Sequence, residues 1–134
     1  MSSVAVRSAL ETALAAMTPS VATAYENVAF SPTPGTAYQR VNVLLTTPLN
    51  DELSRSYEER GFMQVTLCYP LNVGPGTAAT RAELIRSTFY RGRTLSASGV
   101  TVLINLTPEI LPAFVDGDRF CVPVRVPFKA PITV

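Results

Sequence analysis

The residue types that most often carry enzymatic or metal chemistry are scarce in this sequence. The chain has 134 residues, no histidine and two cysteines. Without imidazole, the Ser-His-Asp and Cys-His hydrolase arrangements and every histidine-ligated metal site are excluded. Cys68 and Cys121 lie far apart, each inside an apolar run, so they do not fit a paired metal-binding motif. We interpret them as two buried thiols and not as a disulfide.

Two glycine-containing motifs suggest ligand binding, but each lacks a residue that the chemistry requires. Residues 74–77 (GPGT) precede a helical pattern, yet the lysine of a phosphate loop is missing. Residues 116–118 (DGD) resemble the start of a calcium loop, but Pro127 stands where a bidentate glutamate is needed. We therefore expect a turn with a helix cap at the first motif and a hairpin turn at the second, and we expect no metal and no cofactor.

Residues 50–60 form the most densely charged segment of the chain. Its charged residues are Asp51, Glu52, Arg55, Glu58, Glu59 and Arg60. Glu58 and Glu59 are neighbours, so on a strand they would point to opposite faces and would not act as an acid–base pair. We interpret the segment as solvated or as facing a partner. With no other catalytic arrangement in the sequence, we expect that the protein is not an enzyme.

The overall charge argues against tight nucleic-acid binding. Eleven Lys or Arg residues balance ten Asp or Glu residues, which gives a net charge of +1. Each phosphate contact needs its own cation, so a protein that grips nucleic acid carries a larger excess. All the cations except Lys129 are arginines, a residue type that pairs well with carboxylates at protein interfaces.

A cluster of arginines lies on the second predicted helix and just after it. Its members are Arg81, Arg86, Arg91 and Arg93. On a helical wheel the first two flank an apolar face, an arrangement that is common where subunits meet. The alternative is a solvated helix face whose arginine stems cover the core.

Apolar periodicity predicts two helices and a set of strands. The helices are expected at residues 3–17 and 77–90, where apolar side chains recur at spacings of three and four. Strands are expected at residues 37–45, 62–69, 94–97, 100–106 and 119–128, and residues 24–30 can form at most an edge strand. Hairpin turns are predicted at residues 98–99 and 116–117.

These elements predict one α+β domain over residues 1–134, with two helices packed on an antiparallel or mixed β-sheet. Pro123 and Pro127 lack backbone donors, so the last strand is expected at a sheet edge or outside the sheet. The longest uncharged stretch, residues 61–80, contains Pro70 and Pro75 and is not expected to cross a membrane.

Segments along most of the chain carry a family likeness. They are residues 24–30 (AYENVAF), 32–35 (PTPG), Tyr38, Arg40, 60–62 (RGF), 64–67 (QVTL), 69–70 (YP), Gly74, Gly76, 81–85 (RAELI), 115–119 (VDGDR) and 122–124 (VPV). Together they span residues 20–128 and resemble a small family of siphophage proteins related to tail terminators. The charged segment 50–60 and residues 129–134 carry little of this likeness.

The resemblance implies a small α+β protein that forms a hexameric ring on the last ring of a phage tail tube. Such a ring would end tube polymerisation and would present the surface that the head–tail connector protein binds. DNA would pass through its lumen without specific binding. The resemblance thus implies a structural virion protein at the head-proximal end of the tail, assembled in the host cytoplasm, with no membrane partner.

Under this hypothesis, two sets of residues would make contacts. The arginines of the cluster would pair with acids of the adjacent subunit, for which Glu109 and Asp116 are the candidates. The loop at residues 46–60 would contact the tube or line the lumen through Asp51, Glu52, Arg55, Glu58 and Glu59.

Two other functions stay open on the sequence alone. One is a head-side connector or neck component, which would bind the portal side and not the tube. The other is a monomeric module whose apolar strand faces bind a small ligand or another protein.

Overall fold

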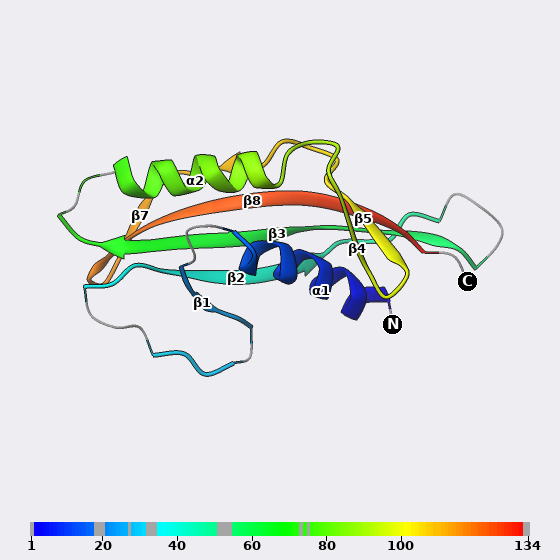
Figure 1. Cartoon of the computed structure of the whole chain (residues 1–134), viewed down its shortest axis with the longest axis horizontal. Helices are drawn as coiled ribbons and strands as arrows, with labels where there is room; N and C mark the ends of the chain where they lie inside the picture. Colours follow the sequence, from blue (N-terminus) through cyan, green and yellow to red (C-terminus); the bar gives the residue numbers. More distant parts are fainter. Residues whose placement is uncertain are drawn as a thin grey trace.

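The computed structural model describes residues 2–17, 21–26, 28–31, 35–50, 55–72, 74 and 76–132, and the structural statements below refer to these residues. Figure 1 shows their arrangement, with β3 and β8 side by side along the length of the molecule. In chain order the elements are α1 (Ser2–Ala15), β1 (Ala22–Ala24), β2 (Tyr38–Leu45), β3 (Tyr57–Pro70), α2 (Gly76–Thr88), β4 (Thr94–Ala97), β5 (Val100–Leu103), β6 (Glu109–Ile110), β7 (Phe114–Asp116) and β8 (Arg119–Ile132).

The antiparallel pair β3–β8 is the centre of the sheet. The two strands pair from Tyr57 opposite Ile132 to Pro70 opposite Arg119. Beyond β3 the sheet continues with β2, to which β1 adds in parallel, and beyond β8 it continues with β5 and β4. The sheet is therefore mixed, in the order β1-β2-β3-β8-β5-β4, and the short strands β6 and β7 also pair with β8.

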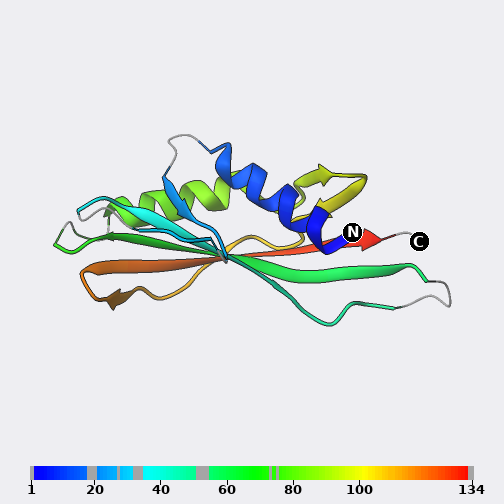
Figure 2. The same ribbon diagram turned by 90° about the horizontal axis from the view of Figure 1, so that it is seen from below.

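The proportions and the shape of this sheet correct the expected fold class. Strands make up 46% of the structure and helices 22%, and the sheet curls into a half-barrel. Figure 2 shows the β4–β5 hairpin raised beside α1 instead of continuing a flat sheet. The expected layout of two helices packed on a sheet is therefore wrong: the chain is mostly β and only roughly α+β. Strand twist accumulates along strands of 14 residues and produces such a curl, which local apolar spacing does not reveal.

The hydrophobic core lies between the helices and one face of β3 and β8. Met63, Val65 and Leu67 are fully buried on that face, each opposite a valine of β8. Leu10 of α1 and Ile85 of α2 are fully buried in the same cluster. Burying a side chain of this kind stabilises a fold by about 1.5 to 3 kcal/mol. Both helices therefore form where the apolar spacing predicts them, although α1 contacts β4 and β5 while α2 contacts β8 and β3.

The position of β8 corrects a second expectation. It was expected at an edge because of Pro123 and Pro127, yet it has neighbours on both sides. The backbone N–H of Leu111 donates to the Pro123 carbonyl at 2.9 Å, and in an antiparallel strand the N–H and C=O of one residue point the same way. The missing donor of Pro123 therefore faces the β6–β7 side, as does that of Pro127 four residues later. All the backbone N–H groups of β8 that face β3 are therefore present.

Most predicted boundaries agree with the structure to within a few residues. Strand β4 matches its predicted range, and the turn after it places Ser98 and Gly99 at positive φ, as a two-residue hairpin requires. The second turn lies at Gly117 and Asp118, one residue later than predicted, because Asp116 pairs with Arg119. The strands at residues 62–69 and 119–128 are longer than predicted, the strand at 100–106 ends at residue 103, and the edge strand lies at 22–24. No described helix is long and apolar enough to cross a membrane.

Gly61 allows β2 and β3 to approach closely. A Cβ atom on this residue would overlap with the backbone carbonyl oxygen of Leu44 and would lie 3.0 Å from the Leu45 Cα atom. These are backbone atoms, so the clash cannot be relieved by rotating a side chain. Gly61 is thus required by the packing of the two strands and not by its φ angle.

We expect Gly61→Ala to lower the free energy of unfolding by about 2 kcal/mol, because the strands must separate to admit the methyl group. The matched control is Gly76→Ala, where no atom lies within 4 Å of the added Cβ. This control should change the stability by less than about 0.5 kcal/mol. Urea denaturation of both variants measures the difference, and equal midpoints would contradict the role of Gly61.

Candidate functional site

Arg81 is one of the residues that line a pocket between α2 and β3. The residue is 4% exposed, and the pocket of about 540 Å3 is also lined by Val21, Tyr69, Thr80 and Leu84. Burial lowers the pKa of the Arg81 guanidinium, and the nearby Tyr69 opposes this shift. Burial raises the pKa of the Tyr69 hydroxyl, an effect that the charge of Arg81 reduces. The pocket therefore combines a desolvated cation, hydroxyl groups and apolar walls, a set of groups suited to a carboxylate on an apolar segment.

Arg86 and Arg93 are bonded within their own chain. Arg86 Nε donates to the Pro108 carbonyl at 3.1 Å, and its Nη1 lies 3.5 Å from Glu83 Oε1. Arg93 Nη1 donates to the Thr88 carbonyl at 2.5 Å, and its guanidinium lies 5.9 Å from the centre of the Phe89 ring. These two arginines therefore tie α2 to the segments that follow it.

The predicted arginine cluster is not one continuous surface. Arg81 lies in the pocket near the start of α2, whereas Arg91 is exposed in the turn after its end. The sequence pattern placed Arg81 at the rim of an apolar face, but its side chain is buried within that face. The pocket itself was missed, because Val21, Tyr69 and Arg81 come from three segments that no local pattern connects.

The two predicted acidic partners lie on the strands beside β8. Glu109 is exposed on β6, opposite Arg125 of β8. Asp116 is exposed at the end of β7, at the base of the β7–β8 turn. The side chain of Asp118 in this turn is 79% exposed, and Val115 is also strongly exposed. We call residues 115–118 the hairpin tip, which is both acidic and apolar.

The hairpin tip and the Arg81 pocket are two separate surfaces at the same end of the β3–β8 ladder, where Tyr69 pairs with Phe120. Among the described residues, β7 pairs with β8 alone and β1 pairs with β2 alone. Val21, which lines the pocket, directly precedes β1. The tip belongs to the β7–β8 turn, whereas the pocket lies between α2 and β3 and is also lined by Val21. Figure 1 shows β7 and the start of α2 at the same end of the molecule.

The charged segment at residues 46–60 is partly an extended ribbon. The N–H of Thr46 donates to the Arg60 carbonyl at 2.8 Å, and Leu49 exchanges two backbone hydrogen bonds of 2.9 Å with Glu58. Glu58 also forms an ion pair of 2.9 Å with Arg60. Glu59 is only 8% exposed in this chain, so of the two predicted alternatives, solvation or contact with a partner, solvation does not describe this residue.

The remaining predicted contact residues divide between described and undescribed parts. Arg55 is exposed. The predictions for Asp51 and Glu52 lie outside the described residues. The structure therefore describes both arms of the loop that is predicted to contact the tube or the lumen, residues 46–50 and 55–60, but not residues 51–54.

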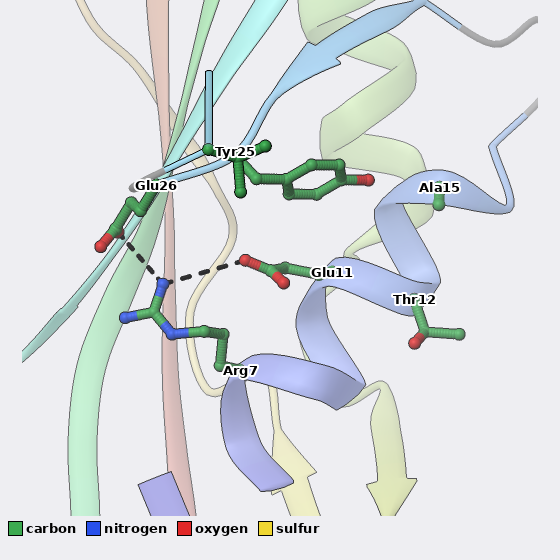
Figure 3. Close-up of a pocket in the computed structure, with 7 residues that line it drawn as sticks. Arg7, Glu11, Thr12, Ala15, Tyr25 and Glu26 are labelled. Atoms are coloured by element: carbon green, nitrogen blue, oxygen red, sulfur yellow. Dashed lines mark ion pairs between the residues drawn. The ribbon is translucent and has the colours of Figure 1, made fainter. Parts of the chain in front are cut away.

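A second pocket, of about 630 Å3, lies between α1 and the segment after β1 (Figure 3). Arg7 is 3.3 Å from Glu26 and 3.8 Å from Glu11, and Glu26 Oε1 accepts a hydrogen bond of 2.5 Å from the backbone N–H of Val43. These contacts connect α1 to the segment that follows β1, and they connect that segment to β2. No group of three or more His, Cys, Asp or Glu residues able to hold a metal occurs in the described part of the chain.

Glu11 makes the stability depend on pH. Burial raises its pKa above 4.5, an effect that Arg7 opposes and Glu26 reinforces. The folded chain then binds this proton more tightly than the unfolded chain, so the free energy of unfolding falls as pH rises from about 4.5 through the raised value.

We expect Glu11→Gln to remove this dependence and to raise the free energy of unfolding at pH 7 by less than about 1 kcal/mol. Urea denaturation at a series of pH values measures the slope. Glu83→Gln, at a side chain that is 62% exposed, serves as the control and should follow the parent curve. Parallel curves for the parent chain and Glu11→Gln would contradict the assignment.

A family model described as phage tail terminator protein matches residues 5–128, in agreement with the resemblance inferred from the sequence. No curated protein matches the chain at a significant level. Among solved structures, one chain superposes with a TM-score of 0.78 at 20% identity, covering 100% of this chain and 99% of the other. At that identity the likeness shows the fold alone.

The family match extends over almost the whole chain, including α2, the pocket and the hairpin tip. Members of such a family are structural components of the virion tail. The chain therefore belongs to the phage tail terminator family.

Proposed function

We propose that this protein forms a closed hexameric ring at the head-proximal end of a non-contractile phage tail tube. The ring ends tube polymerisation and provides the surface to which the head–tail connector binds. Membership of the tail terminator family supports this role. The observation that carries the proposal is the presence of two different and complementary surfaces on one chain, the acidic hairpin tip and the Arg81 pocket. A ring closes only when one face of each subunit fits a different face of the next.

In the proposed interface the hairpin tip of one subunit enters the Arg81 pocket of its neighbour. Asp116 and Asp118 bring carboxylates, and Arg81 brings a guanidinium that is already desolvated by its own chain. Charge-assisted hydrogen bonds between such groups are stronger than neutral ones. The exposed side chain of Val115 would meet the apolar walls at Val21 and Leu84.

The other arginines contribute in two ways. Arg86 and Arg93 hold α2 to its own chain and so fix the geometry of the pocket. Arg91 is exposed and is available to an acid of the adjacent subunit, for which Glu109 is the second candidate. We expect Arg91 to add little to affinity, because exposed ion pairs contribute less than about 1 kcal/mol.

The ribbon at residues 46–60 is the proposed contact with the tube or the lumen. Its described arms, residues 46–50 and 55–60, extend beyond the part of the sheet that the helices cover (Figure 2). Arg55 is exposed there, and Asp51, Glu52 and Glu58 add negative charge to the same segment. The net charge of +1 suits a channel through which DNA slides without being held.

The terminating function has a direct test. Phage particles that lack this chain should carry tubes of abnormal and variable length that are not joined to filled heads. Purified protein added to tube subunits should limit tube length in a dose-dependent way, because the ring covers the growing end. Electron micrographs measure both lengths. Tails of normal length on particles without the chain would overturn the proposal, and binding to the portal but not to the tube would assign it to the neck instead.

A negative charge introduced at the rim of the pocket tests the interface itself. Thr80 is exposed at the pocket rim, so its replacement leaves the core intact. We expect Thr80→Glu to weaken self-association at least about tenfold through repulsion of the acidic hairpin tip. Its uncharged isostere Thr80→Gln should stay within about twofold of the parent chain. Sedimentation velocity, with and without tube subunits, measures the assembly.

A second substitution supplies the rescue. Asp118→Lys combined with Thr80→Glu restores opposite charges across the interface and should recover most of the assembly. Equal assembly of Thr80→Glu and Thr80→Gln would exclude this pocket as the contact. A chain that stays monomeric at every concentration, with tube subunits present, would instead favour a monomeric binding module.

A further inference from the structure

Cys68 and Cys121 lie directly opposite each other in the central strand pair. Cys68 is on β3 and Cys121 on β8, and they are register partners. Both thiols are free and buried, and the Cys121 Sγ lies 3.2 Å from the Cys68 Sγ. The two residues are 53 positions apart in the chain, so only the β3–β8 ladder brings them together.

The register places the two cysteines at the closer type of antiparallel pair. The Pro123 carbonyl accepts a hydrogen bond from Leu111 on the side away from β3, and Cys121 has the same parity as Pro123. Cys121 therefore directs its backbone groups away from β3 and forms a non-hydrogen-bonded pair with Cys68. In such pairs the Cα atoms lie about 4.5 Å apart, within the range that a disulfide spans.

An aromatic cover separates this pair from solvent on the face opposite the helices. Tyr38 of β2 is buried with the two cysteines, and Phe30 packs against this cluster with its ring centre 5.3 Å from that of Tyr38. The guanidinium of Arg119 lies 5.1 Å from the Tyr38 ring centre. Burial and the hydrogen bond to Cys68 raise the pKa of the Cys121 thiol to about 12. The pair therefore reacts slowly while the cover is closed.

We propose that Cys68 and Cys121 form an oxidisable pair that closes to a cross-strand disulfide with a hydroperoxide as the oxidant. One thiolate attacks a peroxide oxygen, which breaks the O–O bond and yields a sulfenic acid and hydroxide. The second thiol then attacks the sulfenic sulfur, which forms the S–S bond and releases water. The two cysteines lose two electrons in total, hydrogen peroxide gains them, and the thiol protons leave as part of two water molecules.

The consequence for the virion rests on the proposed function. A tail protein assembled in a reducing cytoplasm keeps both thiols and gains the disulfide only after release into an oxidising medium. The bond would then join β3 to β8 and close a loop that contains α2 and β4 to β7. Closing a loop of this length restricts the unfolded chain and stabilises the fold.

The chemistry is tested on the purified chain. Reduced protein is treated with dilute hydrogen peroxide and then unfolded in the presence of an alkylating agent. Its mass is measured by mass spectrometry. We expect a loss of about 2 Da, no alkylated cysteine, no cross-linked dimer and a melting temperature higher by about 10 °C, all reversed by a dithiol reductant. Alkylation of both cysteines after treatment, higher oxides of sulfur, or a disulfide between chains would overturn the proposal.

Two variants separate this pair from general thiol reactivity. The melting temperature of Cys121→Ser should not rise on oxidation. Oxidation of this variant should stop at its one remaining sulfur, that of Cys68. Phe30→Ala should close the same disulfide several times faster, since it opens the cover while both cysteines stay in place. An unchanged rate in Phe30→Ala would exclude the cover as the barrier.

Virions provide a separate test of whether the disulfide forms in the particle. Particles unfolded in alkylating agent without reductant should yield this chain with both cysteines unmodified by the agent. A disulfide that forms in the purified chain but is absent from virions would confirm that the two cysteines can be oxidised to a disulfide. It would exclude a role for that disulfide in the particle. Because tube length and ring formation are measured independently, failure of the ring proposal would leave the purified-chain result unaffected.

Discussion

The antiparallel ladder between β3 and β8 is the interaction on which the rest of the molecule depends. It brings the buried residues of two distant segments into one face, against which α2 and the core side chains pack. It also sets Cys68 opposite Cys121 and fixes the start of β8 next to β7, which positions the hairpin tip. The candidate interface and the thiol pair are therefore both consequences of a single register.

Much of the fold could be predicted from local patterns, because periodicity reports which face of an element is buried. The spacing of Leu10 and Ile85 located both helices, and the alternation from Met63 to Leu67 located the central strand. The curl of the sheet and the central place of β8 could not be predicted in this way. Both depend on accumulated twist and on which side of a strand each proline faces, and these are properties of the assembled sheet.

The candidate site was predictable as residue types but not as an arrangement. The arginines of α2 and the acid Asp116 were identified as interface candidates, and the family likeness gave them a role. What the sequence could not indicate is that Arg81 is buried and shares a pocket with Val21. Nor could it indicate that Arg86 and Arg93 bind carbonyl groups of their own chain. Burial of a charged side chain depends on segments that meet only in three dimensions.

The prolines of β8 have a consequence for how copies of the chain meet in a crowded cell. An open strand edge templates indiscriminate pairing with any other strand, which leads to fibres instead of finite particles. Pro123 and Pro127 leave gaps in the donors along the outer side of β8, and only brief strands cover that side. Other strands therefore find no continuous template on that side of β8, which disfavours open-ended aggregation through it.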